Sequence, residues 1–394
     1  MTTPSSDRLL TPRFLLVTAA ALAYFVSIGM LLPVVPQYVR RALDGNDVVV
    51  GIAVGAFAVG AIALRPIAGR LGDRYGRRVL LIGGSAVVAL SIVLYAPIDA
   101  LPVLVGLRLL TGVGEAFFFV GAGTMAADLA PEHRRGEAIS YWSVAIYGGL
   151  AFGPVLGEIV LSHDRYDAVW IVAAALSLVA MLLSLGTRDV FAGEAKPGEE
   201  AVLLHRAALA PGSILFLGLV GVTAFTAFMP LYVREVGLHD SRYLFLEYGT
   251  LVLIVRLVGA RLPDRLGPLH AGTAALIGVM AGMGVIAGWR APAGLIVGTA
   301  IFAAGMSLLY PALLLLALAG TDERERASVV GTFSTFFDLA LGLGAVIVGA
   351  VSEAAGYRGG FLTAGALALV GLAFLRGGSR LRARAERAAP AHGS

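Results

Sequence analysis

Cysteine is absent from the 394 residues of the chain, and charged residues are scarce, at 14%. Without cysteine, neither disulfide bonds nor thiolate metal sites are possible. A soluble globular chain would carry a charge on about a quarter of its residues. Hydrophobic residues instead make up 58% of this chain, and its mean hydropathy is +0.84. This composition indicates a protein that crosses a membrane several times.

Signatures of enzymes and of nucleotide-driven pumps are also missing. The sequence has no zinc-binding helix pair and no nucleophile elbow, and it has no glycine-rich phosphate loop with its lysine, because Lys196 is the only lysine. No basic face interleaved with aromatic residues indicates nucleic-acid binding. We therefore expect no catalysis, no cofactor, no use of ATP and no nucleic-acid partner.

Long apolar runs dominate what is present. Each can cross the roughly 30 Å of bilayer hydrocarbon as a helix that rises about 1.5 Å per residue. Transmembrane β-strands would appear instead as short segments of alternating polarity. We predict an all-α membrane protein with twelve spans, at 14–39, 48–70, 79–97, 101–127, 137–161, 166–187, 211–234, 243–262, 270–289, 291–318, 327–352 and 357–376.

A basic turn after the second run returns half a chain later. Counted 191 positions on, Arg65, Arg70, Leu71, Asp73, Arg74 and Gly76 recur as Arg256, Arg261, Leu262, Asp264, Arg265 and Gly267, and Gly69 becomes Ala260. Such a repeat predicts two related six-helix bundles. We assign an N-terminal bundle to 1–187, a cytoplasmic linker to 188–210, a C-terminal bundle to 211–376 and a cytoplasmic tail to 377–394. The tail has no apolar face and is expected to lack regular structure.

The basic residues predict the orientation in the membrane. Segments on the side of the N-terminus hold 20 of the 30 Arg and Lys residues, and the opposite loops hold seven. The positive-inside rule then places both termini in the cytoplasm, in a multi-pass protein of the inner (cytoplasmic) membrane. Arg65, Arg108 and Arg256 lie within spans, and we interpret Arg256, which repeats Arg65, as a brace of the inner helix ends and not as a substrate ligand.

The first copy of the turn reads Gly69-Arg70-Leu71-Gly72-Asp73-Arg74-Tyr75-Gly76-Arg77-Arg78. It resembles the G-x-L-x-D-R-x-G-R-R signature of the major facilitator superfamily. Within that superfamily, the chain resembles the twelve-span drug:proton antiporters of multidrug efflux. The resemblance implies a monomeric secondary transporter that moves a small molecule and protons across the bilayer as two helix bundles rock.

The resemblance also implies a cytoplasmic latch at this turn, formed by Gly69, Asp73, Arg74, Gly76 and Arg77, with Asp128 as the acidic partner of the arginines. Physically, Gly69 would permit close approach of helices and Gly76 a tight turn. Asp73 would accept from the N–H groups of a helix start or pair with an arginine. Alternatively, the arginines only set the topology.

The fifth run resembles a signature associated with export, G-x-x-x-G-P-x-x-G-G. Gly149, Gly153 and Gly157 recur every four residues and predict a groove for close helix packing, and Pro154 predicts a kink. Glu158 stands where the signature has its last glycine. It adds an acid near the outer face, which we interpret as a proton entry point. Ordinary packing of small residues is the alternative for the glycines.

Proton coupling needs a group inside the membrane that can gain and lose a proton. The deepest acids are Glu115 and Asp338, each near the middle of its run. An idle acid there would be costly, so we predict a role in coupling for both, without deciding which carries the proton. Arg108 begins a stretch that resembles the antiporters' R-x-x-x-G-x-G motif, and is expected to face water or a carboxylate. Glu115 lies about 10 Å further along the helix, too far for direct contact.

Aromatic residues on spans that flank the cavity in this superfamily are candidates for substrate binding: Tyr24, Phe118, Phe228, Tyr232, Tyr310 and Phe336. Together with the two acids, they favour a lipophilic substrate, lipophilic cations included. Gln37 and Asn46 are the only residues of their types, which argues against import of a polar solute.

We therefore predict export of small lipophilic compounds, drug-like or secondary metabolites, in exchange for protons. Three alternatives stay open: proton-coupled import of a sugar or another small metabolite, transport of a lipid or lysolipid, and a membrane sensor that transports nothing.

Overall fold

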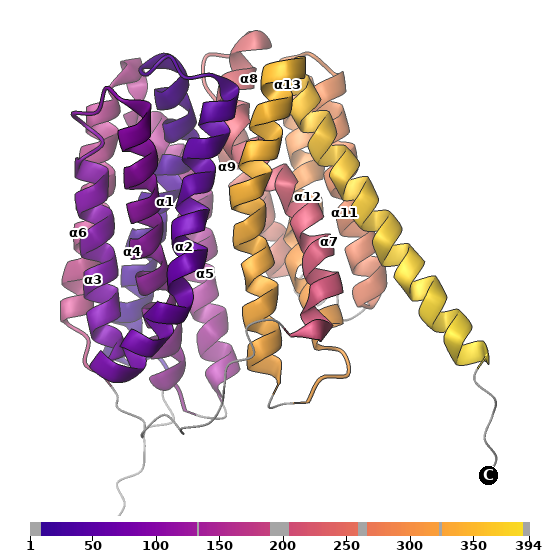
Figure 1. Cartoon of the computed structure of the whole chain (residues 1–394), viewed down its shortest axis with the longest axis horizontal. Helices are drawn as coiled ribbons and strands as arrows, with labels where there is room; N and C mark the ends of the chain where they lie inside the picture. The colour runs from indigo at the N-terminus through magenta and orange to yellow at the C-terminus, as the bar shows by residue number, and fades with distance from the viewer. Residues whose placement is uncertain (1–8, 132–133, 190–204, 259–265, 323–324, 389–394) are drawn as a thin grey trace, which may run out of the picture. The chain divides into compact units, whose positions relative to one another are not determined.

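The computed structural model describes residues 9–131, 134–189, 205–258, 266–322 and 325–388, and its regular structure in these ranges is entirely helical (Figure 1). The helices are α1 (Pro12–Arg41), α2 (Asp47–Tyr75), α3 (Arg77–Val93), α4 (Leu101–Asp128), α5 (Arg135–Val160), α6 (Tyr166–Leu185), α7 (Arg206–Thr223), α8 (Met229–Glu235), α9 (Arg242–Val258), α11 (Pro268–Gly288), α12 (Pro292–Leu318) and α13 (Arg326–Ala388). A short 3₁₀ helix, η2 (Ser162–Asp164), precedes α6, and a π-helix, η3 (Ala224–Phe228), joins α7 to α8.

These helices follow the apolar runs of the sequence closely. Nine helices of the described part are long and apolar enough to cross a membrane. Helices α3 and α9 are shorter, at 17 residues each. The last two predicted spans are joined in α13, which breaks at Gly356, where φ is +72°. The all-α membrane fold is thus confirmed, and the number of twelve crossings stays a prediction.

The two copies of the repeated turn share one backbone conformation. Gly76 has φ +93° and precedes α3, and Gly267 has φ +77° and precedes α11. Both values lie in the left-handed region, which glycine adopts without steric cost. The tight turn expected at Gly76 is therefore present at both repeat positions. The rest of the second copy, residues 259–265, lies outside the described ranges.

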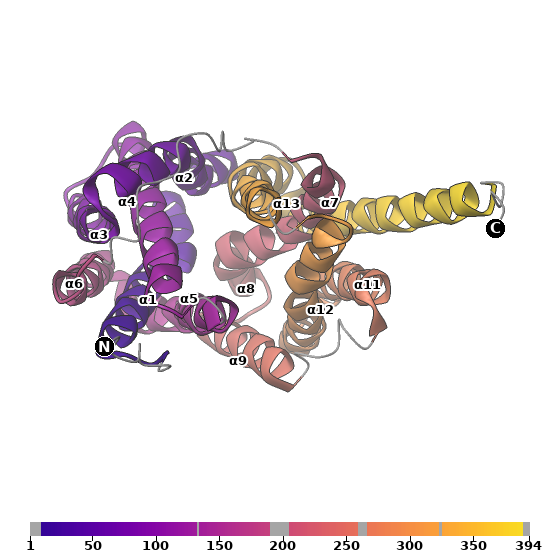
Figure 2. The ribbon, with the colours of Figure 1, turned by 90° about the horizontal axis from the view of Figure 1, so that it is seen from below.

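The chain divides into two compact units. The first comprises Met1–Glu199 with Thr226–Gly249, and the second comprises Glu200–Phe225 with Thr250–Ser394. In the first unit α1 packs against α5 and α6, and α4 packs against α2 and α3 (Figure 2). In the second unit α7 packs against α13, and α11 against α12.

The first unit contains all of the predicted N-terminal bundle and, in addition, Thr226–Gly249 from the second half of the sequence. Two close contacts explain why this segment belongs there. Gly249 of α9 packs so tightly on α5 that a Cβ atom would come within 2.8 Å of the Ala151 Cβ atom. Ser241 donates a hydrogen bond to Glu158 of α5 over 2.7 Å. The predicted division at 188–210 remains a proposal, and most of that linker lies outside the described residues.

The prediction that residues after 377 lack regular structure is wrong as far as Ala388, where α13 ends. The segment is rich in arginine and alanine, which are good helix formers, and its first proline is Pro390. Absence of an apolar face did not prevent the helix, because α13 is already nucleated by the membrane-length helix before it.

Candidate functional site

A buried ion pair links α2 to α4 in the first unit. Arg65 of α2 approaches Glu115 of α4, with 3.6 Å between Nη2 and Oε1. Glu115 is only 6% exposed, and the Arg65 side chain is 20% exposed. A carboxylate at this depth needs a nearby positive charge or a proton. Arg65 is the counter-charge of Glu115, a pairing that the sequence did not predict. The Arg256 side chain lies outside the described part of the chain.

Aromatic side chains surround this pair, and we call Tyr24, Phe25, Phe118, Phe119 and Trp142 the inner aromatic cluster. Tyr24 of α1 stacks on Phe118 of α4, with 3.9 Å between ring centroids. The Phe119 ring lies 6.3 Å from Phe25 and 5.2 Å from Trp142 of α5. The Arg65 guanidinium lies over the same Phe119 ring, 4.7 Å from its centroid. Four helices thus contribute to one charged and aromatic site.

The sequence identified only part of this cluster. Of the predicted substrate-binding residues, Tyr24 and Phe118 are in direct contact, and both are fully buried. Trp142 was missed. As a tryptophan in the first third of an apolar run that also carries the glycine signature, it gave a usable signal.

Arg108 is buried in the same unit, at 3% exposure. Its Nε donates to the Ala53 carbonyl of α2 over 3.1 Å, and its guanidinium lies 4.9 Å from the Phe57 ring centroid. The expectation that Arg108 faces water or a carboxylate stays a prediction, since the contacts found for its guanidinium are the Ala53 carbonyl and the Phe57 ring. The expected separation of Arg108 from Glu115 is confirmed, since Glu115 pairs with Arg65 instead.

Glu158 lies near the end of α5 and is 8% exposed. Its Oε1 accepts hydrogen bonds from Gln37 Nε2 of α1 over 2.9 Å and from Ser241 Oγ over 2.7 Å. Gln37 also donates to the Pro33 carbonyl. Glu158 therefore connects α1, α5 and the segment before α9 through a single carboxylate oxygen.

The glycine groove predicted on α5 is confirmed, and its partner is α1. A Cβ atom on Gly149 would come within 2.5 Å of the Phe25 Cβ atom. On Gly153 it would lie 2.7 Å from the Gly29 Cα atom and from the Val26 carbonyl oxygen. Gly157 approaches the Met30 backbone in the same way, and α5 continues as a helix through Pro154. Only glycine lets the two backbones pass this closely.

The turn between α2 and α3 is held by ion pairs. Arg77 Nη1 lies 2.5 Å from Asp73 Oδ1, and Arg77 Nε lies 3.6 Å from Asp128 Oδ2. The predicted pairing of Asp73 with an arginine, and of the arginines with Asp128, is thus present through Arg77. Arg74 lies over the Tyr75 ring at 5.2 Å. The close helix approach expected at Gly69 is wrong, because a Cβ atom there would meet nothing within 4 Å.

A residue that the sequence analysis missed completes this turn. Asp189, four residues beyond the end of α6, accepts a hydrogen bond from the Arg78 backbone N–H over 2.8 Å. Arg78 also donates from Nη2 to the Leu185 carbonyl over 2.6 Å. Because the N-cap of α3 is Gly76, which has no side chain, Asp189 provides the anionic cap from elsewhere in the chain.

We expect Asp189→Ala to destabilise the protein by about 1 kcal/mol, the usual effect of removing a helix N-cap. The measurement is the apparent unfolding temperature of the purified protein in detergent. Asp189→Asn is the matched control, because its amide oxygen can still accept from Arg78, and it should retain most of the stability. Equal stability of the alanine variant and the unmodified protein would refute the capping role.

The second unit holds the other deep acid and two of the other predicted aromatic residues. Asp338 of α13 is 7% exposed. Tyr310 of α12 lies 5.2 Å from the Phe333 ring and 6.3 Å from the Phe337 ring. Phe336 packs on α7, where a Cβ atom on Gly212 would overlap its ring. Phe228 and Tyr232 are buried in the segment that belongs to the first unit.

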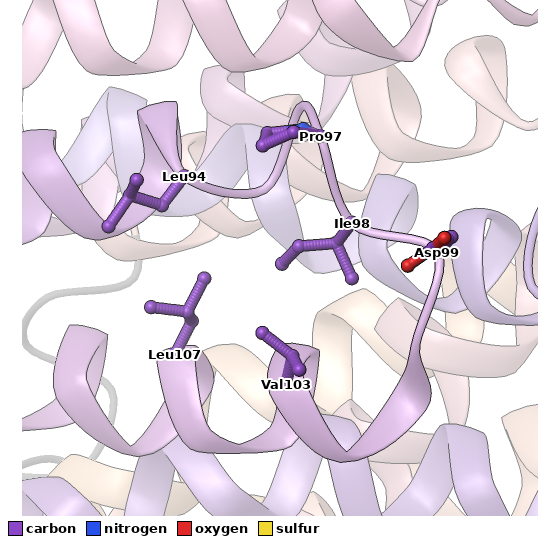
Figure 3. A pocket seen from close by; sticks show the side chains of 6 residues that line it. All are labelled: Leu94, Pro97, Ile98, Asp99, Val103 and Leu107. Atoms are coloured by element: carbon purple, nitrogen blue, oxygen red, sulfur yellow. The ribbon is translucent and has the colours of Figure 1, made fainter.

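A separate apolar pocket of about 280 Å³ lies at the connection between α3 and α4 (Figure 3). Its lining residues are Leu94, Pro97, Ile98, Asp99, Val103 and Leu107. None of these residues was predicted to bind substrate, and Asp99 is its only charged group. Within the part of the chain that the structure describes, no group of three His, Asp or Glu side chains could hold a metal ion.

Membrane-length helices around a buried ion pair define a multi-pass helical membrane protein with a polar site in its interior. A family model described as the Major Facilitator Superfamily matches residues 17–340 and 248–393. The chain therefore belongs to the major facilitator superfamily of membrane transporters, which bind small-molecule substrates.

Curated relatives cover nearly the whole chain. An uncharacterised transporter of this superfamily from Salmonella typhimurium (strain LT2) is 29% identical over 367 residues, which is 91% of this chain and 94% of the relative. An uncharacterised transporter from Burkholderia mallei (strain SAVP1) is 28% identical over 393 residues, with 95% of each chain covered.

Solved structures support the same fold. A bacterial homologue of the human lysosomal transporter Spinster, in an inward-facing and occupied conformation, matches with a TM-score of 0.80 at 17% identity and covers 93% of this chain and 96% of that chain. The nucleoside transporter NupG matches with a TM-score of 0.73 at 14% identity, over 92% of this chain and 98% of that chain. At these identities the similarity concerns the fold.

Proposed function

We propose that the chain exports small lipophilic compounds in exchange for protons, by alternating access of two helix bundles in the cytoplasmic membrane. One observation carries the proposal: the acid Glu115 is buried against Arg65 at the edge of the inner aromatic cluster. This arrangement combines a group that can bind a proton with apolar surface that can bind a lipophilic molecule. Both termini lie in the cytoplasm in this proposal, and one chain is the transporting unit.

The proton and the substrate would act on the same ion pair. With Glu115 ionised, the pair with Arg65 is neutral and the site is compatible with a lipophilic molecule. When Glu115 binds a proton, the site gains a net positive charge in a medium of low dielectric constant, which disfavours the occupied state. Proton uptake from outside would thereby promote release of the substrate on that side.

Other residues have supporting roles in this proposal. Asp338 is the second candidate for the coupling acid, since it is similarly buried. Glu158 conducts protons from the outer end of α5. The positive charge of the buried Arg108 favours the ionised form of the buried acids. The ion pairs of Asp73, Arg77 and Asp128 and the close contact of α1 with α5 serve as gating elements.

Arg65 suggests a second candidate function. This function is the proton-coupled import of an organic anion. If a proton neutralises Glu115, Arg65 can attract the carboxylate of a substrate, and the proton and the anion then move in the same direction. The two candidate functions differ in how proton binding affects substrate binding. A bound proton weakens substrate binding in the export proposal and strengthens it in the import proposal.

A drug-susceptibility panel in an efflux-deficient host would first identify a transported compound, and proteoliposomes would then measure its movement. We expect accumulation in vesicles with an acidic lumen, by about tenfold per pH unit of gradient, since a tenfold proton ratio equals about 1.4 kcal/mol. Accumulation with an alkaline lumen would support anion import instead. Transport that does not change with the imposed pH gradient would refute proton coupling. Protein-free vesicles control for passive partition of the compound into the lipid.

A further inference from the structure

Three buried polar atoms around the inner aromatic cluster have no hydrogen-bond partner among the described residues. They are the Tyr24 hydroxyl oxygen, the Trp142 Nε1 and the Glu115 Oε2. Their residues are 0%, 6% and 6% exposed. Buried polar groups in proteins are nearly always paired, because an unmade hydrogen bond costs free energy. Three such atoms at one site therefore point to a ligand that provides the missing partners.

The three atoms border one aromatic surface. The Tyr24 ring stacks on Phe118, and Glu115 lies three residues before Phe118 on α4. Phe119 lies one helical turn after Glu115 and contacts the Trp142 ring. Glu115, Tyr24 and Trp142 are thus connected through Phe118 and Phe119, and we take their three atoms to be recognition points of one ligand.

The atoms define the chemistry of that molecule. The Trp142 N–H can only donate, a Tyr24 hydroxyl can donate, and an ionised Glu115 oxygen can only accept. The ligand must therefore offer at least one acceptor and one donor. Since Arg65 already balances the charge of Glu115, a permanent cation would have to compete with Arg65, whereas a neutral ligand leaves the pair intact.

We infer that the inner aromatic cluster binds flat, neutral heteroaromatic compounds that carry a hydrogen-bond acceptor beside a hydrogen-bond donor. This inference rests on the proposed function for the same site, and it narrows the substrate class from lipophilic compounds in general. Recognition depends on Tyr24 and Trp142 as donors and on Glu115 as the acceptor.

Four bicyclic probes of nearly equal shape test the inference: 2-quinolone, which has both a donor and an acceptor; quinoline, which has only an acceptor; naphthalene, which has neither; and N-methylquinolinium, a permanent cation. Ligand-observed NMR with the full chain in nanodiscs would give the affinities. We expect 2-quinolone to bind at least about tenfold more tightly than naphthalene, which corresponds to about 1.4 kcal/mol. N-methylquinolinium should bind more weakly than quinoline.

Two substitutions test whether Tyr24 and Trp142 donate hydrogen bonds to the ligand. Tyr24→Phe and Trp142→Phe should each weaken 2-quinolone binding by several-fold and leave naphthalene binding unchanged, since each removes a donor and keeps an aromatic ring. Tyr75→Phe and Trp289→Phe are matched controls, because these side chains are 55% and 51% exposed and lie outside the cluster. They should change neither affinity.

Several results would overturn the inference: a variant that weakens 2-quinolone and naphthalene equally, tighter binding of N-methylquinolinium than of quinoline, or no binding of any probe. Failure of the proposed function is a separate result. In that case the probes bind in the expected order, but uptake into proteoliposomes does not respond to a pH gradient.

Discussion

Glu115→Gln is expected to lower proton-driven transport by about a hundredfold or more. The substitution keeps the shape of the side chain but removes the proton-binding group and leaves Arg65 facing a neutral amide. Without a proton-binding group at the site, the gradient cannot drive exchange through it, and a hundredfold loss of rate corresponds to about 2.7 kcal/mol. The measurement is uptake into proteoliposomes under an imposed pH gradient.

A second readout separates coupling from folding. Exchange of labelled for unlabelled substrate needs no net proton movement, so it should continue in Glu115→Gln if the protein is folded. Glu137→Gln is the matched control, because Glu137 is a half-exposed acid in the first turn of α5 that pairs with Arg134, the residue before that helix. Its transport should be unchanged.

Comparison with Asp338→Asn decides which acid carries the proton. Full gradient-driven transport in Glu115→Gln together with its loss in Asp338→Asn would transfer the coupling role to α13. Loss in both variants would mean that the two buried acids act in one proton path.

Gly153→Ala is expected to remove most transport and to lower the apparent unfolding temperature by several degrees. The added methyl group would lie 2.7 Å from the Gly29 Cα atom and from the Val26 carbonyl oxygen, so α1 and α5 would have to separate. Backbone atoms cannot rotate away as side chains do, and overpacking of this kind costs about 1–3 kcal/mol. Thermal unfolding in detergent and substrate uptake would measure the two effects.

The neighbouring Gly148 provides the control for this experiment. A Cβ atom on Gly148 would meet only the Leu22 Cδ1 atom, at the ordinary contact distance of 3.7 Å. Gly148→Ala should therefore retain both stability and transport, and helix propensity favours alanine at both sites. Equal behaviour of the two variants would show that the contact between α1 and α5 tolerates an extra methyl group.

Features set by local spacing could be predicted from the sequence. The four-residue interval of Gly149, Gly153 and Gly157 places all three on one face of a helix, whatever the tertiary structure. The pairing of Asp73 with Arg77 is also local, because the two residues flank the Gly76 turn, which keeps their side chains near each other. Gly76 could be identified because it separates two long apolar runs, where the chain has to turn.

Features that join distant helices could not be predicted in the same way. The Arg65–Glu115 pair depends on the rotation of α2 against α4, which no periodicity in one helix determines. Asp189 caps α3 only because α6 ends beside the α2–α3 turn. At Gly69 the sequence predicted a contact that is absent. The glycine belongs to a motif and was interpreted as a packing position, but no neighbouring atom would meet a Cβ atom there.

The bond between Glu158 and Ser241 has a consequence for biosynthesis. Membrane insertion proceeds from the N-terminus, and the first compact unit lacks one of its parts until Gly249 has left the ribosome. During that interval Glu158 has Gln37 as its partner but not Ser241, while translation of the second half has already begun. The first compact unit is therefore complete only after part of the second half of the chain has been synthesised.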